Sequence, residues 1–228
     1  MMLSLALWLT LAAGNDAAAL ARFEAALERD PDNLRVANDY RREVIRTGEY
    51  DRAIEFFGKL TAAHPQAPYA WLNYGYAYVD KIPAAGSITQ VILANSALGH
   101  FTKSIDLRRS WLALYTRGNS YLYWPKIFGR APLGVKDLEE AVAIARKEAK
   151  KKPVYVRSWI ALGDGYVKTD QPDKAKAIWR EAVEVFGTNP DLQARLGKSG
   201  EELDAFLYEV HDPNKRVDTD LTPLLEEK

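Results

Sequence analysis

The sequence predicts an all-α fold built from tandem helical hairpins. The triplet Ala19, Phe23 and Pro31 recurs as the same residue types 34 positions further along the chain. Residues 159–166 follow the pattern Trp-x2-Leu-Gly-x2-Tyr, and residues 71–78 and 114–121 keep its glycine and its final tyrosine. Self-similarity at a fixed period of this length indicates supersecondary units that bury their apolar faces against their neighbours. We therefore expect a helical solenoid.

The composition excludes several classes of site. The 228 residues include 31 Lys plus Arg and 31 Asp plus Glu, so the formal net charge at pH 7 is zero. A nucleic-acid partner needs a basic field, which this balance does not supply. Cysteine is absent, which excludes disulfides, thiolate nucleophiles and cysteine zinc sites. We predict no cofactor and no nucleic-acid partner.

The first 14 residues have the pattern of an export signal. Leu3 to Ala13 form an uncharged apolar run that is followed by Gly14, although no Lys or Arg precedes it. The run is shorter than the roughly 20 residues that a membrane-spanning helix needs, so we expect no integral membrane segment. It matches the apolar core of a secretory signal. The expectation is a signal at residues 1–14, cleaved near Asn15, and a periplasmic or secreted protein. The alternative is a cytoplasmic protein in which the run is a structural helix.

The anchor residues resemble those of the tetratricopeptide-repeat (TPR) family. The resemblance covers roughly residues 16–187, and it implies hairpins of 34 residues that stack into a right-handed superhelix. Gly75, Gly118 and Gly163 would let the two helices of a hairpin approach closely, and the aromatic anchors would fill the space between hairpins. About five units are implied, at approximately residues 15–33, 34–67, 68–110, 111–155 and 156–187.

The third and fourth units are enlarged. The spacing between successive anchor glycines grows to 43 and then to 45 residues. The first addition includes residues 80–97, where a capping box of Ser87 and Gln90 predicts the start of an unusually long second helix. The second addition includes a Pro- and Gly-punctuated loop at residues 124–134. It carries a possible second contact surface, formed by Trp124, Ile127 and Phe128.

The repeat pattern fades after Pro190. A capping box of Ser199 and Glu202 precedes apolar residues at helical spacing, which predicts a capping helix within residues 188–210. Residues 211–228 have the composition of an extended tail. From their leucine content we hypothesise that Leu221, Leu224 and Leu225 occupy a groove of the same chain.

The motifs give no sign of catalysis. The three histidines lie far apart in the sequence, and no zinc-protease, calcium-loop or nucleophile-elbow pattern occurs. We therefore predict a protein without enzymatic activity, catalytic residues or a metal site.

The family resemblance implies a concave groove lined by the first helix of each hairpin. In the second unit Arg41 stands where the pattern has glycine. Asparagine amides can bind an extended backbone through both the N–H and C=O groups, and Tyr and Arg are favoured interface anchors. Tyr76, Tyr115 and Tyr123 could instead only fill the inner curve. Asp80 and Asp164 would oppose a ligand carboxylate. The predicted partner-binding residues are Arg35, Asn38, Arg42, Asn73, Tyr76, Tyr115, Asn119, Tyr123 and Lys168.

Together these observations favour a non-enzymatic adaptor of a bacterial cell envelope that holds a peptide or protein segment in the groove. Two alternatives remain open at this point. One is a structural repeat protein that self-associates into a homo-oligomer. The other is a small-molecule carrier or enzyme accessory subunit with a closed, tyrosine-lined channel.

Overall fold

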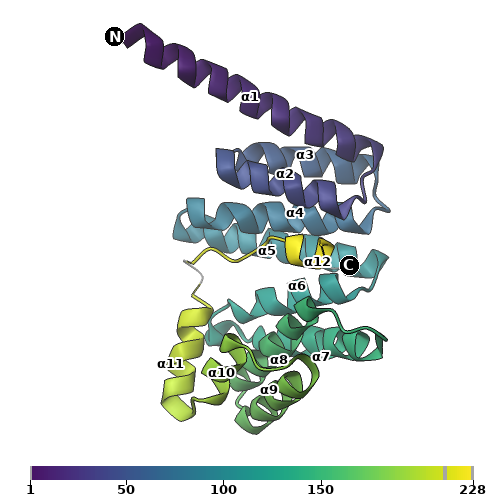
Figure 1. Ribbon diagram of the computed structural model, residues 1–228, viewed down its shortest axis with the longest axis vertical. Coiled ribbons are helices and arrows are strands. Elements are labelled where there is room, and N and C mark those ends of the chain that lie inside the picture. The colour runs from purple at the N-terminus through teal and green to yellow at the C-terminus, as the bar shows by residue number, and fades with distance from the viewer. Residues whose placement is uncertain (1, 213–214, 227–228) are drawn as a thin grey trace. The chain divides into compact units, whose positions relative to one another are not determined.

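The computed structural model describes the backbone of residues 2–212 and 215–226, and side chains from residue 16 onward (Figure 1). Within these ranges every regular element is a helix, which confirms the all-α, repeat-type solenoid. The chain forms two compact units. The first holds the residues up to Leu107 together with Val217–Glu226, and the second holds Arg108–Arg216.

The first unit consists of one leading helix, two hairpins and the C-terminal segment. Helix α1 spans Met2–Arg29, and α2 (Leu34–Thr47) pairs with α3 (Tyr50–Ala63). Helix α4 (Pro68–Lys81) continues through the short 3-10 helix η1 (Ile82–Ala84) into α5 (Ser87–Leu107). The chain returns to this unit at its end, where α12 spans Thr222–Leu225.

Local sequence signals set the ends of the first hairpin. The side chain of Asn33 caps α2 by accepting a 3.0 Å hydrogen bond from the backbone N–H of Val36. Gly48 ends α2 with a φ of 77°, a left-handed conformation that glycine adopts without steric cost. Pro68 begins α4, where its missing N–H would have had no partner within the helix.

Helix α1 packs on the first hairpin through an apolar face and a polar tie. Leu20 and Leu27 are fully buried in a core shared with α2 and α3. Glu24 accepts hydrogen bonds from Tyr40 of α2 at 2.8 Å and from Arg52 of α3 at 2.7 and 2.8 Å. Burial opposes ionisation of Glu24, but these bonds and the charge of Arg52 outweigh it and lower its pKa. The side chains of the predicted signal, residues 1–14, lie outside the described residues.

The second unit repeats the hairpin arrangement and adds two helices. The first hairpin is α6 (Trp111–Leu122), η2 (Lys126–Phe128) and α7 (Ala131–Lys147). Through η3 (Pro153–Tyr155) the chain continues into the second, formed by α8 (Val156–Lys168) and α9 (Pro172–Phe186). Helices α10 (Pro190–Leu196) and α11 (Gly200–Val210) follow.

Several boundaries differ from the sequence-based expectation. Helix α5 is long, as predicted, but Ser87 is its first residue, and Gln90 donates hydrogen bonds to the carbonyls of Ile82 and Ala85. The expected capping helix within 188–210 is two helices, because Gly197–Ser199 interrupt it. The tail is not wholly extended, since it ends in the single helical turn of α12.

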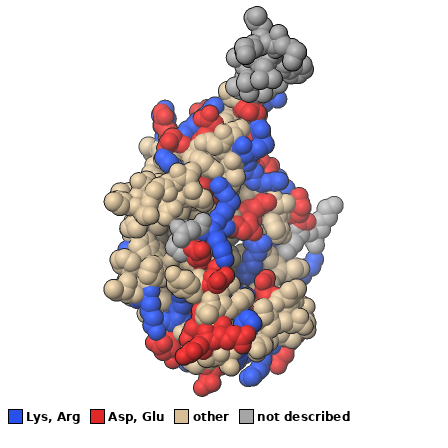
Figure 2. Space-filling model, turned by 90° about the vertical axis from the view of Figure 1, so that its left-hand side faces the viewer, with Lys and Arg blue, Asp and Glu red and all other residues tan. Residues whose placement is uncertain are grey.

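The surface carries charges of both signs. Figure 2 shows Lys and Arg interspersed with Asp and Glu over the face that it presents. Among the residues that the structure describes, no helix has the length and apolar character needed to cross a membrane.

The close approach at Gly75 yields a stability prediction. A Cβ atom there would lie 2.4 Å from the fully buried ring of Phe101 on α5. Gly75→Ala should therefore lower the free energy of unfolding by about 1–3 kcal/mol through overpacking. The control is Gly99→Ala on α5, where a Cβ has open space, and which should raise stability by about 0.5–1 kcal/mol. Urea unfolding followed by circular dichroism measures both, and equal effects would contradict the packing argument.

Candidate functional site

The strongest candidate site is a face of α2 and α4 that carries the end of the chain. Residues Val217–Glu226, here called the tail, belong to the first unit, and α12 lies against α2. Figure 1 draws the tail in yellow beside the helices of this unit. The residues that bond to the tail, here called the tail-binding face, are Arg35, Asn38, Arg41, Arg42 and Asp80.

Arg41 is the centre of the tail-binding face. Its side chain is 1% exposed, and so is that of Asp80, whose Oδ2 accepts from Nη1 at 3.1 Å. Nε donates to Oδ1 of Asn73 at 2.9 Å. Nη2 donates to the backbone carbonyl of Thr219 at 2.9 Å and also reaches Oδ1 of Asn38 at 3.3 Å. A buried guanidinium is tolerated only when its donors have acceptors, and here the tail supplies one of them.

Asn38 and Asp80 extend the contact to neighbouring atoms of the tail. Oδ1 of Asn38 accepts from the backbone N–H of Leu221 at 2.8 Å, and Nδ2 donates to Oδ1 of Asp220 at 3.1 Å. The hydroxyl of Thr219 donates to Oδ1 of Asp80 at 2.5 Å. The bound main-chain groups lie two residues apart, as on one side of an extended segment. The face therefore binds peptide backbone as well as side chains.

Asp220 adds an ionic contact at the rim. Its Oδ2 lies 3.7 Å from Nε of Arg42, whose side chain is 56% exposed, so this pair contributes little on its own. Burial opposes ionisation of Asp220, but hydrogen bonds from Thr222 and Asn38 and the charge of Arg42 lower its pKa. The tail therefore binds with this carboxyl in its charged form.

The leucines of the tail also meet the first unit. Leu221 is 7% exposed, and Leu224 and Leu225 are half-buried. The carbonyl of Leu225 accepts a hydrogen bond from Nη2 of Arg35. The tail thus occupies a surface of its own chain, as hypothesised from its leucine content.

Two further predicted residues, Asn73 and Tyr76, contact the side chain of Arg41. Asn73 is fully buried and donates to the carbonyl of Tyr69 at 2.8 Å, which fixes its amide oxygen toward Nε of Arg41. The ring of Tyr76 lies 4.4 Å from the guanidinium carbon, a cation–π contact, and meets Phe101 edge-on at 5.4 Å. The structure therefore brings Arg35, Asn38, Arg42, Asn73 and Tyr76 together in one network around Arg41.

The other predicted groove residues lie in the second unit. Tyr115 of α6 stacks on Trp111 at 5.2 Å, and Asn119 is half-buried on the same helix. The ring of Tyr123 meets His211 edge-on at 5.2 Å. Lys168 donates to the carbonyl of Leu122 at the end of α6, and burial lowers the pKa of Lys168.

A buried ionic cluster joins α8 to α10 and to His211 in the second unit. Asp164 accepts from Nε and Nη2 of Arg195 on α10 at 2.6 and 2.8 Å. Nε2 of His211 lies 3.6 Å from the same carboxylate. Burial nevertheless lowers the pKa of His211, because the charge of Asp164 only partly offsets it and Lys168 and Arg195 repel a second cation. In this unit α10 supplies the arginine, whereas in the first unit Arg41 lies on the hairpin itself.

The predicted second contact surface is only partly on the surface. Trp124 is 8% exposed, covered by the guanidinium of Arg130 at 3.7 Å from its ring and by the edge of Phe128 at 5.5 Å. Ile127 and Phe128 are 90% and 55% exposed. The apolar surface at this loop is therefore made by Ile127 and Phe128.

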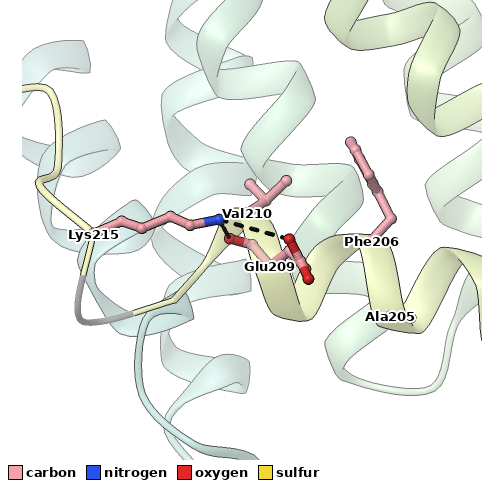
Figure 3. Close-up of a pocket in the computed structure, with 5 residues that line it drawn as sticks. All are labelled: Ala205, Phe206, Glu209, Val210 and Lys215. Atoms are coloured by element: carbon pink, nitrogen blue, oxygen red, sulfur yellow. Dashed lines mark hydrogen bonds and ion pairs between the residues drawn. The ribbon is translucent and has the colours of Figure 1, made fainter.

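A shallow hollow lies beside α11, with none of the predicted residues in its lining. Figure 3 shows Ala205, Phe206, Glu209 and Val210 of α11 together with Lys215 of the following segment. Lys215 donates to the carbonyl of Glu209 at 2.9 Å and lies 3.8 Å from its carboxylate. These contacts hold the segment against the helix, and they pair the two charged side chains of the lining with each other rather than with a ligand.

Sequence reasoning missed the importance of Arg41 and Asp80. Arg41 was visible only as a departure from the glycine of the repeat pattern, and Asp80 only as an acid on the predicted groove. A cation at a position that favours a small residue was the available signal, because such a side chain must find acceptors when it is buried.

Comparison with known proteins agrees with the fold. A family model described as the tetratricopeptide repeat matches residues 10–73. The solved structure of a thermophilic TPR protein from Thermus thermophilus superposes with a TM-score of 0.56 at 23% identity, over 82% of this chain and 92% of that one. A crystal structure of MamA gives a TM-score of 0.51 at 17% identity, over 83% of this chain and 89% of that one. At these identities the structural likeness shows the fold.

Among curated proteins, the human protein O-mannosyl-transferase TMTC3 is 21% identical over 205 residues, which cover 90% of this chain. The mouse protein of the same name is 21% identical over 174 residues. The chain spans about a fifth of the length of these curated relatives, at 21% and 18%.

The buried charge of Arg41 yields a second stability prediction. Arg41→Met leaves the Asp80 carboxylate buried without its cation and should lower the free energy of unfolding by about 3–5 kcal/mol. The control is the same substitution at the adjacent Arg42, which should change stability by less than about 1 kcal/mol because its ion pairs are exposed. Urea unfolding compares the two variants. A similar, small effect at both positions would show that the buried pair does not stabilise this face.

Proposed function

We propose that this chain, whose residues 10–73 match the tetratricopeptide-repeat family model, is a non-enzymatic adaptor whose tail-binding face holds an extended segment of a partner protein. Repeat solenoids of this kind generally act as scaffolds for protein partners, since their stacked hairpins present extended binding surfaces. One observation carries the proposal. The face already holds a peptide, the tail, through hydrogen bonds to the main chain at Thr219 and Leu221.

The chemistry of the face suits a peptide better than a small molecule. Asn38 offers an acceptor and a donor side by side, which pair with the N–H of one residue and the side chain of the residue before it. Nη2 of Arg41 points its donor at a backbone carbonyl. The groups that they bind are the C=O and the N–H of residues two positions apart in one chain, so the occupant that suits the face is a polypeptide.

The curated relatives are named as mannosyl-transferases, but the chain matches only about a fifth of their length. We propose that the shared part is the repeat scaffold and that transfer chemistry belongs to other parts of those proteins. On this proposal, the adaptor acts by positioning a partner.

We also propose that the adaptor works in a bacterial cell envelope after export. The uncharged apolar run of Leu3–Ala13 and the small residues after it support an export signal. The check is the intact mass of the protein from its native host, with cell fractions kept separate. We expect a chain that begins near Asn15 in the envelope fraction. A full-length chain in the cytosol would overturn export and leave the binding proposal unaffected.

Binding in trans tests the adaptor proposal. Leu221→Asp in the full chain places a charge at a buried position of the tail and should free the face. A labelled peptide of residues 216–226 should then bind at least about tenfold more tightly than to the unaltered chain, because the tethered tail competes at roughly millimolar effective concentration. Fluorescence anisotropy measures the affinity.

The matched controls add a second substitution to Leu221→Asp. Asn38→Leu should weaken peptide binding by roughly 10- to 100-fold, because it removes the three hydrogen bonds of Asn38 to the backbone N–H of Leu221 and to the side chains of Asp220 and Thr222. Asn95→Leu, at an exposed asparagine of α5, should leave the affinity unchanged. If the peptide does not bind the Leu221→Asp chain at millimolar concentration, the tail-binding face is not a peptide site.

A further inference from the structure

We propose that the partner segment carries a hydroxyl residue, an acidic residue and a leucine in succession, followed by a second hydroxyl residue, and that Thr219–Thr222 are this chain's own copy of that motif. This inference rests on the proposed function and names the ligand class of the same face.

The first position requires a hydroxyl group. Thr219 is 5% exposed, and its Oγ1 donates to Oδ1 of Asp80, a carboxylate that is itself almost fully buried. Arg41 contacts the other oxygen of this carboxylate, so the two oxygens divide between a cation and a hydroxyl donor. An aliphatic residue here removes the hydroxyl that donates to this buried carboxylate, and an acidic residue meets like charge. Thr or Ser is therefore selected.

The second position requires a short acid. Asp220 accepts from Nδ2 of Asn38 at 3.1 Å and lies within 3.7 Å of Arg42. The same carboxylate accepts from the backbone N–H and the hydroxyl of Thr222 at 2.9 and 2.6 Å, which turns the chain into α12. One Asp side chain thus contacts the face and shapes the peptide. A longer Glu would shift the carboxylate away from its own turn, and a Lys would face Arg42.

The third position requires an apolar residue with a free N–H. Leu221 is 7% exposed, and its N–H donates to Asn38. A charged side chain would be desolvated here, and proline would lack the donor. The fourth position, Thr222, completes the turn through its hydroxyl.

Charge supports the same assignment. The tail carries Asp218, Asp220 and Glu226 and no basic residue, whereas Arg35, Arg41 and Arg42 of α2 all contact it. Opposite charge on two surfaces raises the encounter rate and disfavours basic peptides.

The test is a set of 11-residue peptides covering residues 216–226. Each peptide is titrated against the full-length protein, in which the substitution Leu221→Asp has released the tail from the face. A second released variant, Thr219→Glu, places a carboxylate next to Asp80 and guards against a folding defect in the first. The peptides carry Thr219→Val, Asp220→Lys or Leu221→Lys, and Pro223→Ala serves as the control at an exposed position.

We expect each of the first three changes to weaken binding at least about tenfold, because each leaves buried or charged groups of the face unpaired, while the control peptide binds like the natural one. If the natural peptide binds and all three changed peptides bind equally well, the motif is overturned but the adaptor proposal stands. Failure of the natural peptide to bind either released variant overturns both. The two proposals can therefore fail separately.

Discussion

The buried pair of Arg41 and Asp80 is the constraint on which the arrangement of the first unit depends. Both side chains are 1% exposed, and removing two such charges from water costs several kcal/mol each unless their remaining donors and acceptors are satisfied. Within the two hairpins, the amide oxygens of Asn73 and Asn38 accept hydrogen bonds from Nε and Nη2 of Arg41. The carbonyl of Thr219 accepts from Nη2 of Arg41, and its hydroxyl donates to Asp80, so the tail contacts both members of the pair.

The second unit also buries a charged side chain, but the residues that pair with it belong to the same continuous segment, Arg108–Arg216. One of its buried carboxylates, Asp164, is paired with Arg195 from α10 and approached by His211, the residue that follows α11. Burial lowers the pKa of His211, so near neutral pH the histidine adds no second cation to the site. Arg195 lies 31 residues from Asp164 in the sequence, whereas in the first unit one acceptor of Arg41 comes from 178 residues away. That difference is why we propose that the exchangeable occupant lies on the first unit.

The sequence was sufficient to predict the hairpins and several residues of the site, but not the network that joins them. The approach of Gly75 to Phe101 follows from a local pattern of small and aromatic residues, which is why the repeat could be predicted. The bonds of Arg41 join residues 32, 39 and 178 positions apart, and no periodicity encodes them. The sequence indicated that Asp80 would oppose a ligand carboxylate. The structure adds that Asp80 accepts a hydrogen bond from the hydroxyl of Thr219, a contact that depends on the register of the tail.

A ligand that belongs to the same chain needs little intrinsic affinity. If the effective concentration of the tail is of order 1 mM, an intrinsic dissociation constant of about 0.1 mM keeps roughly nine-tenths of the molecules closed. A partner segment with an intrinsic dissociation constant of about 1 μM would then appear about tenfold weaker and would still displace the tail at tens of micromolar. Because the incoming segment supplies the same hydroxyl, carboxylate and backbone groups, Arg41 and Asp80 stay satisfied in both states. On the proposed exchange, the buried pair keeps its partners in both states, and the concentration and sequence of the partner decide which segment is bound.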